Sequence, residues 1–465
     1  MKIQYKNYYF TERDDVNIIY DFERNNIMSY PKTVNISRII EMLNEKELEE
    51  KYIKEIPKVD LDIYDYIKNN IIDTDNRCFD SFEFLKRNDF RITSASLMIT
   101  QNCNLRCTYC YGGESGMYNS NTPFMTKDIA QKAIKKLVNN NKIGNEININ
   151  FFGGEPLMNF ELIKFIVNEC INYPEYKFVF SITTNATLIN EEIALFFKKY
   201  EFRVMISIDG YERIHNYHRK MRNGKGSYSI VVKKIELLRK NGVEFRIRAT
   251  LDHRFYNEYF EINDFLTKFG SDRVTISRLV SYNDDQPSFP LNIEDIKDER
   301  KSIEKYLKKA LSDVLDGKFP RNFPYLSHFK KIVFAEKSLM NCGAYEGGTA
   351  ISSDGKFYPC HRFVGMNDFD FGDVDNGVIE EKIKNQLKSL DENTKKCLNC
   401  FGKYVCQRSC LRDLAKSGGN YIQHDGDYCE ILKETVDDAL ISYYQILTKR
   451  PDFFNTKLIY EKDIH

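Results

Sequence analysis

The sequence predicts an α/β protein built around a partial (β/α)6 barrel, with a smaller unit on each side. Three observations predict this fold. Strand-like and helical patterns alternate between residues 93 and 285, glycine and cysteine motifs follow the predicted strands, and residues 342–429 are rich in cysteine. A chain of 465 residues is too long for a single hydrophobic core, so we expect roughly two to four domains.

The first predicted unit spans residues 1–92. Three β-rich runs, Ile3–Phe10, Val16–Phe22 and Ile27–Tyr30, precede a helical pattern over Ser37–Lys54. Strands and helices in so short a segment favour a winged-helix-like unit. Its 15 Lys+Arg and 19 Asp+Glu residues argue against DNA binding, which needs a basic surface. An edge strand could instead accept an extended peptide by strand addition.

The barrel is predicted from six strand-like runs separated by helical ones. The strands are Ala95–Thr100, Ile147–Phe152, Phe178–Thr183, Arg203–Ile208, Glu244–Leu251 and Arg273–Val280. A helix with Thr126 as its N-cap separates the first two strands, and the helix Ile230–Lys240 separates the fourth and fifth. This alternation predicts a parallel sheet with right-handed crossovers, with the chemistry at the carboxyl ends of the strands.

Four motifs fall at those strand ends. They are Cys103-x3-Cys107-x2-Cys110, Gly153-Gly-Glu155-Pro156, Thr184-Asn185 and Ser207-Ile-Asp209-Gly210. Three thiolates can hold three irons of a [4Fe–4S] cluster, whose full set is four, so one iron stays open for a small molecule. The alternative is a zinc site or a buried loop. Zinc sites usually repeat a two-residue gap, whereas these gaps are three and two residues long.

Two further segments complete the predicted organisation. Residues 286–340 form a charged bridge that includes the helix Ile293–Leu315. Residues 341–435 form a cysteine-rich domain stabilised by metal more than by core burial, and residues 436–465 form a C-terminal helix and a polar tail. Cys78 and Cys170 stand apart from the other cysteines and are predicted to be small buried hydrophobic residues.

Composition limits the partners and the compartment. Lys+Arg and Asp+Glu both number 68, so the net charge is zero and the general electrostatic argument for a nucleic-acid partner is lost. No segment approaches the ~18 apolar residues of a membrane helix, and the N-terminus has no apolar signal core. We therefore expect a cytoplasmic protein, in which twelve cysteines indicate metal ligands rather than disulfides.

The cysteine spacing, together with Gly153-Gly-Glu-Pro after the next strand, resembles the radical S-adenosylmethionine (SAM) enzymes. The later cysteines resemble the SPASM extension of that superfamily. They read Cys342-x17-Cys360, then Cys397-x2-Cys400-x5-Cys406-x3-Cys410, then Cys429. The resemblance covers roughly residues 93–430. It implies S-adenosylmethionine and three [4Fe–4S] clusters as cofactors, one at Cys103, Cys107 and Cys110 and two auxiliary.

The resemblance also assigns residues to S-adenosylmethionine. Glu155 would bind the ammonium group. Gly154 would offer backbone without side-chain bulk, and the backbone of Tyr109 would face adenine. Either Arg219 or Arg248 would meet the carboxylate. The full set is Tyr109, Gly153, Gly154, Glu155, Asn185, Ser207, Asp209, Arg219 and Arg248.

From the residues alone, some of these positions have plainer interpretations. Asp209-Gly210 is also typical of a simple turn, and Arg248 of an ordinary ion pair. The pattern identifies no catalytic acid or base. His215, His218 and His361 are candidates by residue type only.

For the auxiliary clusters, the resemblance implies two ligand sets. Cys397, Cys400, Cys406 and Cys429 would hold a complete cluster. Cys342, Cys360 and Cys410 would hold the other and leave one iron open. Sulfatase maturases of the superfamily have an additional cysteine between the first two positions, and residues 343–359 here contain none. A substrate thiolate is a suitable fourth ligand; water, a backbone group or another side chain is the alternative.

Together these features resemble the thioether-forming maturases of ribosomally made peptides, of the sactipeptide and ranthipeptide kind. The implied mechanism uses a 5′-deoxyadenosyl radical to remove a hydrogen from an acceptor residue. The resulting carbon joins the sulfur of a substrate cysteine. A Cys-containing precursor would bind through its leader at the N-terminal domain, and a flavodoxin- or ferredoxin-type protein would donate electrons.

Three other functions stay open. The chain could be a sulfatase-maturase-like enzyme that forms formylglycine, or it could crosslink carbon to carbon in a peptide. It could also be a non-catalytic iron–sulfur or zinc scaffold that binds a partner.

Overall fold

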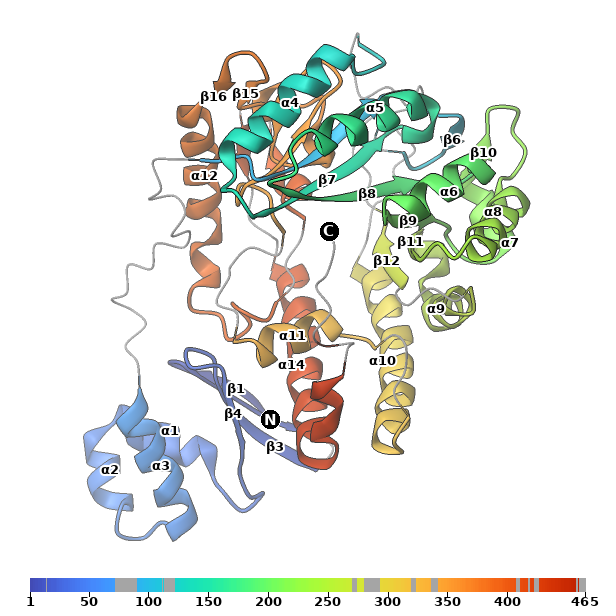
Figure 1. Ribbon diagram of the computed structural model, residues 1–465. Helices are drawn as coiled ribbons and strands as arrows, with labels where there is room; N and C mark the ends of the chain where they lie inside the picture. The colour runs from blue at the N-terminus through green and yellow to red at the C-terminus, as the bar shows by residue number, and fades with distance from the viewer. Residues whose placement is uncertain are drawn as a thin grey trace.

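The computed structural model of this chain places an α/β body and an N-terminal unit on either side of two long helices, α10 and α14 (Figure 1). The described residues are 1–13, 15–71, 90–110, 112, 122–269, 274–279, 293–318, 323–335, 342–406, 410–416, 419–421, 426–456 and 459. Cys78 and both ends of the run Arg273–Val280 lie outside them.

The N-terminal unit is a four-stranded antiparallel meander followed by three helices. Its elements are β1 (Lys2–Tyr5), β2 (Tyr8–Arg13), β3 (Val16–Asp21), β4 (Asn26–Ser29), α1 (Ile36–Asn44), α2 (Lys46–Tyr52) and α3 (Lys58–Asn70). The predicted single strand Ile3–Phe10 is therefore two strands, because the chain turns at Lys6, where φ is +50°. The predicted helix Ser37–Lys54 is also two helices, because Glu45 between them is extended.

Both faces of this small sheet are covered. Tyr8, Phe10 and Ile19 pack with buried residues of α1 and α3 on one face. Tyr9 and Ile18 pack against the C-terminal part of the chain on the other. The unit is therefore joined to the rest of the protein through a hydrophobic core.

The central sheet has eight strands in the order β12-β11-β9-β8-β7-β5-β13-β14. Its strands are β5 (Ser94–Thr100), β7 (Glu146–Gly153), β8 (Lys177–Thr184), β9 (Arg203–Ser207), β11 (Phe245–Leu251), β12 (Val274–Arg278), β13 (Gly348–Ile351) and β14 (Phe357–Tyr358). All pairs except β13–β14 are parallel. The predicted α/β fold with a mostly parallel sheet is thus confirmed.

The connections of this sheet are helical. They contain α4 (Lys127–Asn140), α5 (Phe160–Ile171), α6 (Glu191–Lys199), α7 (Glu212–His218), α8 (Tyr228–Lys240), α9 (Tyr259–Thr267) and the 3-10 helices η2 (Pro156–Asn159) and η3 (His253–Glu258). Thr126 caps α4 as predicted, because its side chain accepts the N–H of Ile129. Cys170 on α5 is buried, also as predicted. A short ribbon, β6 (Leu105–Cys107) with β10 (Arg219–Met221), lies outside the sheet.

The cysteine-rich segment contributes two strands to the sheet of the α/β body. Its strand β13 pairs with β5, and β14 extends the same sheet. The remaining elements are short, apart from α12 (Glu380–Thr394): β15 (Gly372–Asp373), β16 (Gly377–Val378), α13 (Leu411–Leu414), β17 (Ala415–Lys416), β18 (Asn420–Tyr421), η4 (His361–Phe363), η5 (Asn367–Phe369) and η6 (Lys395–Cys397).

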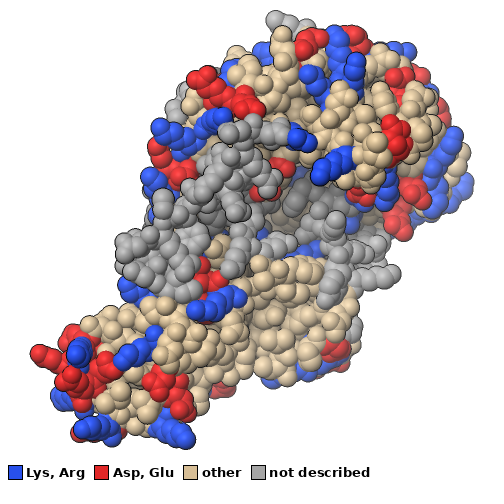
Figure 2. All heavy atoms as spheres, turned by 60° about the vertical axis from the view of Figure 1, so that its left-hand side comes forward, with Lys and Arg blue, Asp and Glu red and all other residues tan. Residues whose placement is uncertain are grey.

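Long helices connect the two halves of the molecule. They are α10 (Ile293–Leu315), which has the predicted bounds, α14 (Gly426–Lys449) and the shorter α11 (Leu326–Val333), with η8 (Pro451–Asn455) after them. The predicted boundary between residues 435 and 436 falls inside α14. In Figure 2 a hollow lies between the upper part of the molecule and the lower part. Among the described residues, no helix is both long and apolar enough to cross a membrane.

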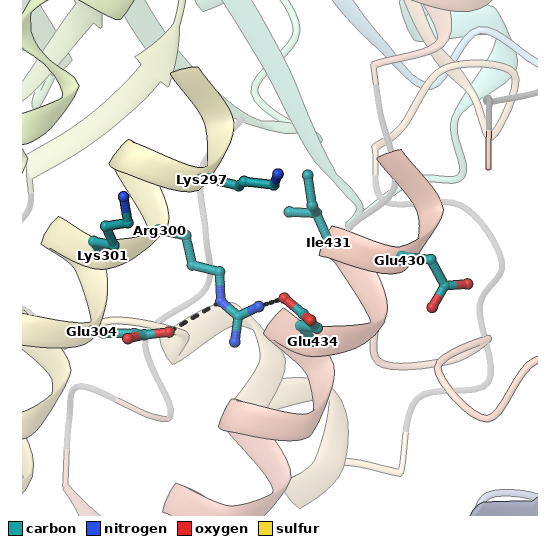
Figure 3. A pocket seen from close by; sticks show the side chains of 7 residues that line it. All are labelled: Lys297, Arg300, Lys301, Glu304, Glu430, Ile431 and Glu434. Atoms are coloured by element: carbon teal, nitrogen blue, oxygen red, sulfur yellow. Dashed lines mark ion pairs between the residues drawn. The ribbon is translucent and has the colours of Figure 1, made fainter. Parts of the chain in front are cut away.

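A pocket between α10 and α14 is lined mainly by charged side chains (Figure 3). Arg300 of α10 pairs there with Glu434 of α14 and with Glu304 on its own helix. The lining residues also include Lys297 and Lys301, which pair with acidic neighbours one turn away on α10. This pocket is a seam of ion pairs between helices and contains none of the predicted ligand residues.

Candidate functional site

The first three cysteines lie on one loop that begins where β5 ends. Cys107 is the last residue of β6 and pairs with Arg219 of β10, and the N–H of Cys110 donates to the carbonyl of Cys107 at 3.0 Å. The Asn185 amide lies 3.8 Å from the Cys103 sulfur. Burial first, and then the Glu155 carboxylate, raise the pKa of Cys103 to about 12. A bound metal ion reverses that effect, because it deprotonates a coordinating thiol.

Two glycines fix the motif that follows β7 against this loop. A Cβ on Gly153 would lie 1.9 Å from the Thr100 carbonyl oxygen, and one on Gly154 would lie 2.3 Å from that of Asn102. The N–H groups of Gly154 and Glu155 donate to those same carbonyls at 2.9 Å. Glycine is therefore required at both positions because they pack closely against the backbone that leads into Cys103. Access of a ligand to the glycine backbone is not the only reason for these residues.

The Glu155 carboxylate is fully buried and joins two strand ends. Its Oε1 accepts the Thr184 hydroxyl at 2.7 Å and the N–H of Leu157 at 3.1 Å, and its Oε2 accepts the N–H of Asn185 at 2.8 Å. Burial raises the pKa of Glu155 to about 7, although these hydrogen bonds oppose the shift. Among the described residues Oε2 has one donor, and a carboxylate oxygen has capacity for two, which fits an additional ammonium donor.

Asp209, Arg219 and Tyr109 form a buried cluster behind the cysteine loop. One Asp209 oxygen accepts the Tyr109 hydroxyl at 2.6 Å and the Arg219 Nε at 2.8 Å. The other accepts the N–H of Thr250 at 2.9 Å. Burial alone would raise the pKa of Asp209, but Arg219 is the main charge that holds it below 3.8. Both Asp209 oxygens thus position protein groups, among them the arginine beside Cys107.

A second buried network holds the same loop, and the sequence did not reveal it. The His218 Nδ1 lies 2.5 Å from the Thr108 hydroxyl, and its Nε2 lies 2.9 Å from Asp252. The Thr108 N–H also donates to the His218 carbonyl at 3.1 Å. His215 is likewise a structural residue, since it contacts the Asp209 N–H and the Ser227 hydroxyl. Lone histidines give no sequence signal for such roles.

One face of the parallel sheet is polar and only half buried. Asn150 of β7 donates to the Ser96 hydroxyl at 3.2 Å and accepts from Ser181 at 3.1 Å, which makes a row across β5, β7 and β8. On β9 and β11, Ser207 is the register partner of Arg248. A parallel strand buried on both faces is normally apolar throughout. The alternation in Glu146–Gly153 was therefore a readable signal that this face is not packed in an apolar core.

His361 joins this polar face to the cysteine-rich segment. Its ring packs on Phe152 of β7, with ring centroids 4.2 Å apart, and it follows Cys360 in the sequence. Burial first, and then the charge of Arg248, lower the pKa of His361 to about 3. The imidazole is therefore neutral at physiological pH. Cys360 thus lies at the border of the polar sheet face.

The later cysteines fall into two groups. Cys410 and Cys342 act electrostatically on Cys360, whose pKa is raised first by burial and then by these thiols. Burial first, and then Cys397 and Cys429, likewise raise the pKa of Cys400. A Cβ at Gly402 would lie 3.5 Å from the Cys406 Cβ and 3.8 Å from the Cys400 sulfur, so these two cysteines are close to the same glycine. The structure thus brings together three thiols in one place and four in another.

These donor sets fit iron–sulfur clusters better than single metal ions. In a cluster each thiolate binds its own iron, so the thiols surround a volume rather than converge on a point. Among the described residues, no three His, Cys, Asp or Glu side chains converge closely enough to bind one metal ion.

Residues 97–266 match the model of the radical SAM superfamily. The chain belongs to the radical SAM superfamily. The match begins in β5, spans the cysteine loop and the Gly153-Gly-Glu motif, and ends in α9. S-adenosylmethionine and a [4Fe–4S] cluster are therefore cofactors of this enzyme.

Relatives of this radical SAM enzyme differ in how much of it they match. A cysteine-type anaerobic sulfatase-maturating enzyme of Clostridium novyi (strain NT) is 28% identical over 356 residues, 73% of this chain and 94% of the relative. The solved structure of native anSMEcpe with bound AdoMet has a TM-score of 0.66 at 22% identity and covers 76% of this chain and 99% of that one. Streptococcus suis SuiB bound to precursor peptide SuiA has a TM-score of 0.50 at 16% identity and covers 92% and 99%.

Proposed function

We propose that this radical SAM enzyme matures a ribosomally made peptide by joining a cysteine sulfur to a carbon in a thioether. The observation that carries the proposal is the group Cys342, Cys360 and Cys410, which offers three thiols where a closed cluster needs four. When bound, S-adenosylmethionine and its cluster supply a radical that removes hydrogen from carbon. An open iron in the auxiliary cluster leaves room for the substrate thiolate.

The protein's own residues have defined tasks in this proposal. Asp209, Arg219 and the pair His218–Asp252 hold the cysteine loop in place. Glu155 and the Ser207–Arg248 pair offer the acceptor and donor groups that the ammonium and carboxylate of S-adenosylmethionine need. The polar sheet face between this loop and Cys360 offers hydrogen bonds to a peptide backbone. In the proposal this face brings a peptide carbon and a cysteine sulfur together, a positioning effect.

The N-terminal unit supports a peptide substrate. The match to anSMEcpe takes in 99% of that structure but only 76% of this chain. The match to SuiB, which was solved with a precursor peptide, takes in 92% of this chain. We propose that residues 1–92 form a winged-helix-like domain that binds the leader of the precursor. A second candidate is formylglycine formation, which the likeness to sulfatase-maturating enzymes favours.

The function is tested by Cys410→Ala. We expect the variant to cleave S-adenosylmethionine at close to the wild-type rate, because Cys103, Cys107 and Cys110 are untouched. Thioether formation in a Cys-containing precursor peptide should fall to background. Mass spectrometry measures both products, since each thioether removes two hydrogen atoms from the peptide. Thioether formation at the wild-type rate would contradict the proposed role of this cluster, and formylglycine in a substrate protein would favour the second candidate.

The edge of β4 is the proposed leader-binding strand. Tyr30 N–H donates to the Asn17 carbonyl at 3.1 Å, and Met28 lies opposite Ile19. Because hydrogen-bonded pairs alternate along an antiparallel ladder, Met28 bonds to β3 and Ser29 directs its N–H and C=O away from it. Among the described strands, β4 is the last in its sheet, so those groups are available to an added strand.

Ser29→Pro should weaken leader binding by about tenfold or more, because proline removes one N–H that an added strand would use. The ladder between β3 and β4 stays intact, and proline is tolerated on edge strands. Calorimetric titration with the leader peptide measures the affinity. Ser29→Ala keeps the N–H and serves as the control. Equal affinity of the two variants would place the leader elsewhere.

A further inference from the structure

The N-terminal sheet lies directly against the chain between two predicted cluster ligands. Tyr9 of β2 stacks on Phe401, with ring centroids 3.6 Å apart and planes 3° from parallel. Phe401 follows Cys400, and both Cys400 and Cys406 border the same hydrophobic cluster. In Figure 1 this sheet lies beside α14, which carries Cys429 near its start. The surroundings of these thiols are thus built partly from the other end of the chain.

Gln4 of β1 binds the peptide groups on both sides of Cys400. Its Oε1 accepts the N–H of Phe401 at 3.0 Å, and its Nε2 donates to the carbonyl of Asn399. These two groups belong to the peptide bonds that follow and precede Cys400. The side-chain amide therefore acts as a neighbouring strand would, and it fixes the direction in which the Cys400 side chain leaves the backbone.

A buried ion pair holds the same loop three residues after Cys400. Lys403 pairs with Glu23 of the N-terminal unit, and the two residues are 3% and 4% exposed. The Lys403 N–H donates to the Cys400 carbonyl at 3.0 Å. Because removal of one partner of a buried pair leaves an uncompensated charge, this contact strongly favours one position of the loop.

We propose that Gln4 is a positioning residue for Cys400, and that the N-terminal sheet forms part of the site of Cys397, Cys400, Cys406 and Cys429. The inference rests on the proposed function only where it takes these four thiols as cluster ligands. It assigns residues 1–92 a second role besides recognition of the precursor. Deletion of the unit then removes both roles, so point variants are needed to separate them.

The test compares Gln4→Ala with wild type and with Gln131→Ala in the full chain. Gln131 is an exposed glutamine of α4 that binds Glu169 and serves as the matched control. In metal-free protein, iodoacetamide should alkylate Cys400 about tenfold faster in Gln4→Ala, because two hydrogen bonds beside it are lost, while Cys360 is unchanged. After reconstitution, the electron paramagnetic resonance signal of one auxiliary cluster should change, and S-adenosylmethionine cleavage should persist.

Gln4→Glu gives the second test. It keeps the acceptor for the Phe401 N–H and loses the donor to Asn399, so the alkylation rate of Cys400 should lie between those of wild type and Gln4→Ala. Equal Cys400 rates in wild type and both Gln4 variants would overturn the positioning role. Only about four irons per reconstituted wild-type chain would overturn the auxiliary clusters. Thiol alkylation, measured without metal, separates these two failures.

Discussion

Cys107→Ala should reduce cleavage of S-adenosylmethionine by at least about a thousandfold, because the reaction has no route without the cluster and we propose Cys107 as one of its ligands. Cys107 forms the register pair of β6 with Arg219, so nearby cysteines cannot take its place without a change of strand pairing. The amount of 5′-deoxyadenosine formed under reducing conditions measures the effect. Iron should fall by about four atoms per reconstituted chain.

Cys170→Ala is the matched control for this variant. Cys170 lies on α5 and is 2% exposed in the hydrophobic core, and it belongs to none of the three cysteine groups. Its substitution should cost about 1 kcal/mol of the free energy of unfolding and leave cleavage and iron content unchanged. Cleavage that survives in Cys107→Ala at more than a few per cent of wild type would show that Cys107 is not an essential ligand.

The sequence predicted the parallel sheet well because its signals are local. Strands β5, β7, β8 and β9 are β-rich runs that end in a motif, and the helices between them have a clear apolar face. For the same reason Thr126 could be recognised as an N-cap, since a cap depends only on the residues that follow it.

The sequence did not predict contacts that depend on distant parts of the chain. Strand β13 has only four residues, and it joins the sheet through β5, more than 250 positions earlier. Gln4 meets Asn399 across 395 positions. No periodicity encodes such pairings, so the cysteine-rich segment looked like a domain of its own.

The reason for the two glycines was predicted only in part. The resemblance explains Gly153 and Gly154 by a bound ligand, but the structure shows that backbone carbonyls already occupy the space of a Cβ at both positions. The motif thus joins two strand ends before any ligand binds. A motif can thus identify a site correctly even where packing of the protein's own backbone, before any ligand binds, is what requires its glycines.

Asp209→Ala should lower the free energy of unfolding by about 3–5 kcal/mol at neutral pH, because it leaves the buried guanidinium of Arg219 without its partner. Asp209 is fully buried and Arg219 is 8% exposed. Tyr109 loses its hydrogen-bond acceptor in the same change. Since Tyr109 lies between Cys107 and Cys110, we expect the cluster to be lost from this variant as well. Urea denaturation of the metal-free protein measures the stability.

The pH dependence of the free energy of unfolding distinguishes loss of the Asp209–Arg219 ion pair from loss of packing. The pKa of Asp209 is held below 3.8, chiefly by Arg219 acting against burial. A carboxyl group with a lowered pKa stabilises the folded protein above its unfolded pKa, and that stabilisation is lost as the pH falls through the folded pKa. The difference between wild type and Asp209→Asn should therefore be full at neutral pH and shrink below about pH 4. A difference that stays constant down to pH 3 would mean that packing, and not the ion pair with Arg219, accounts for the effect.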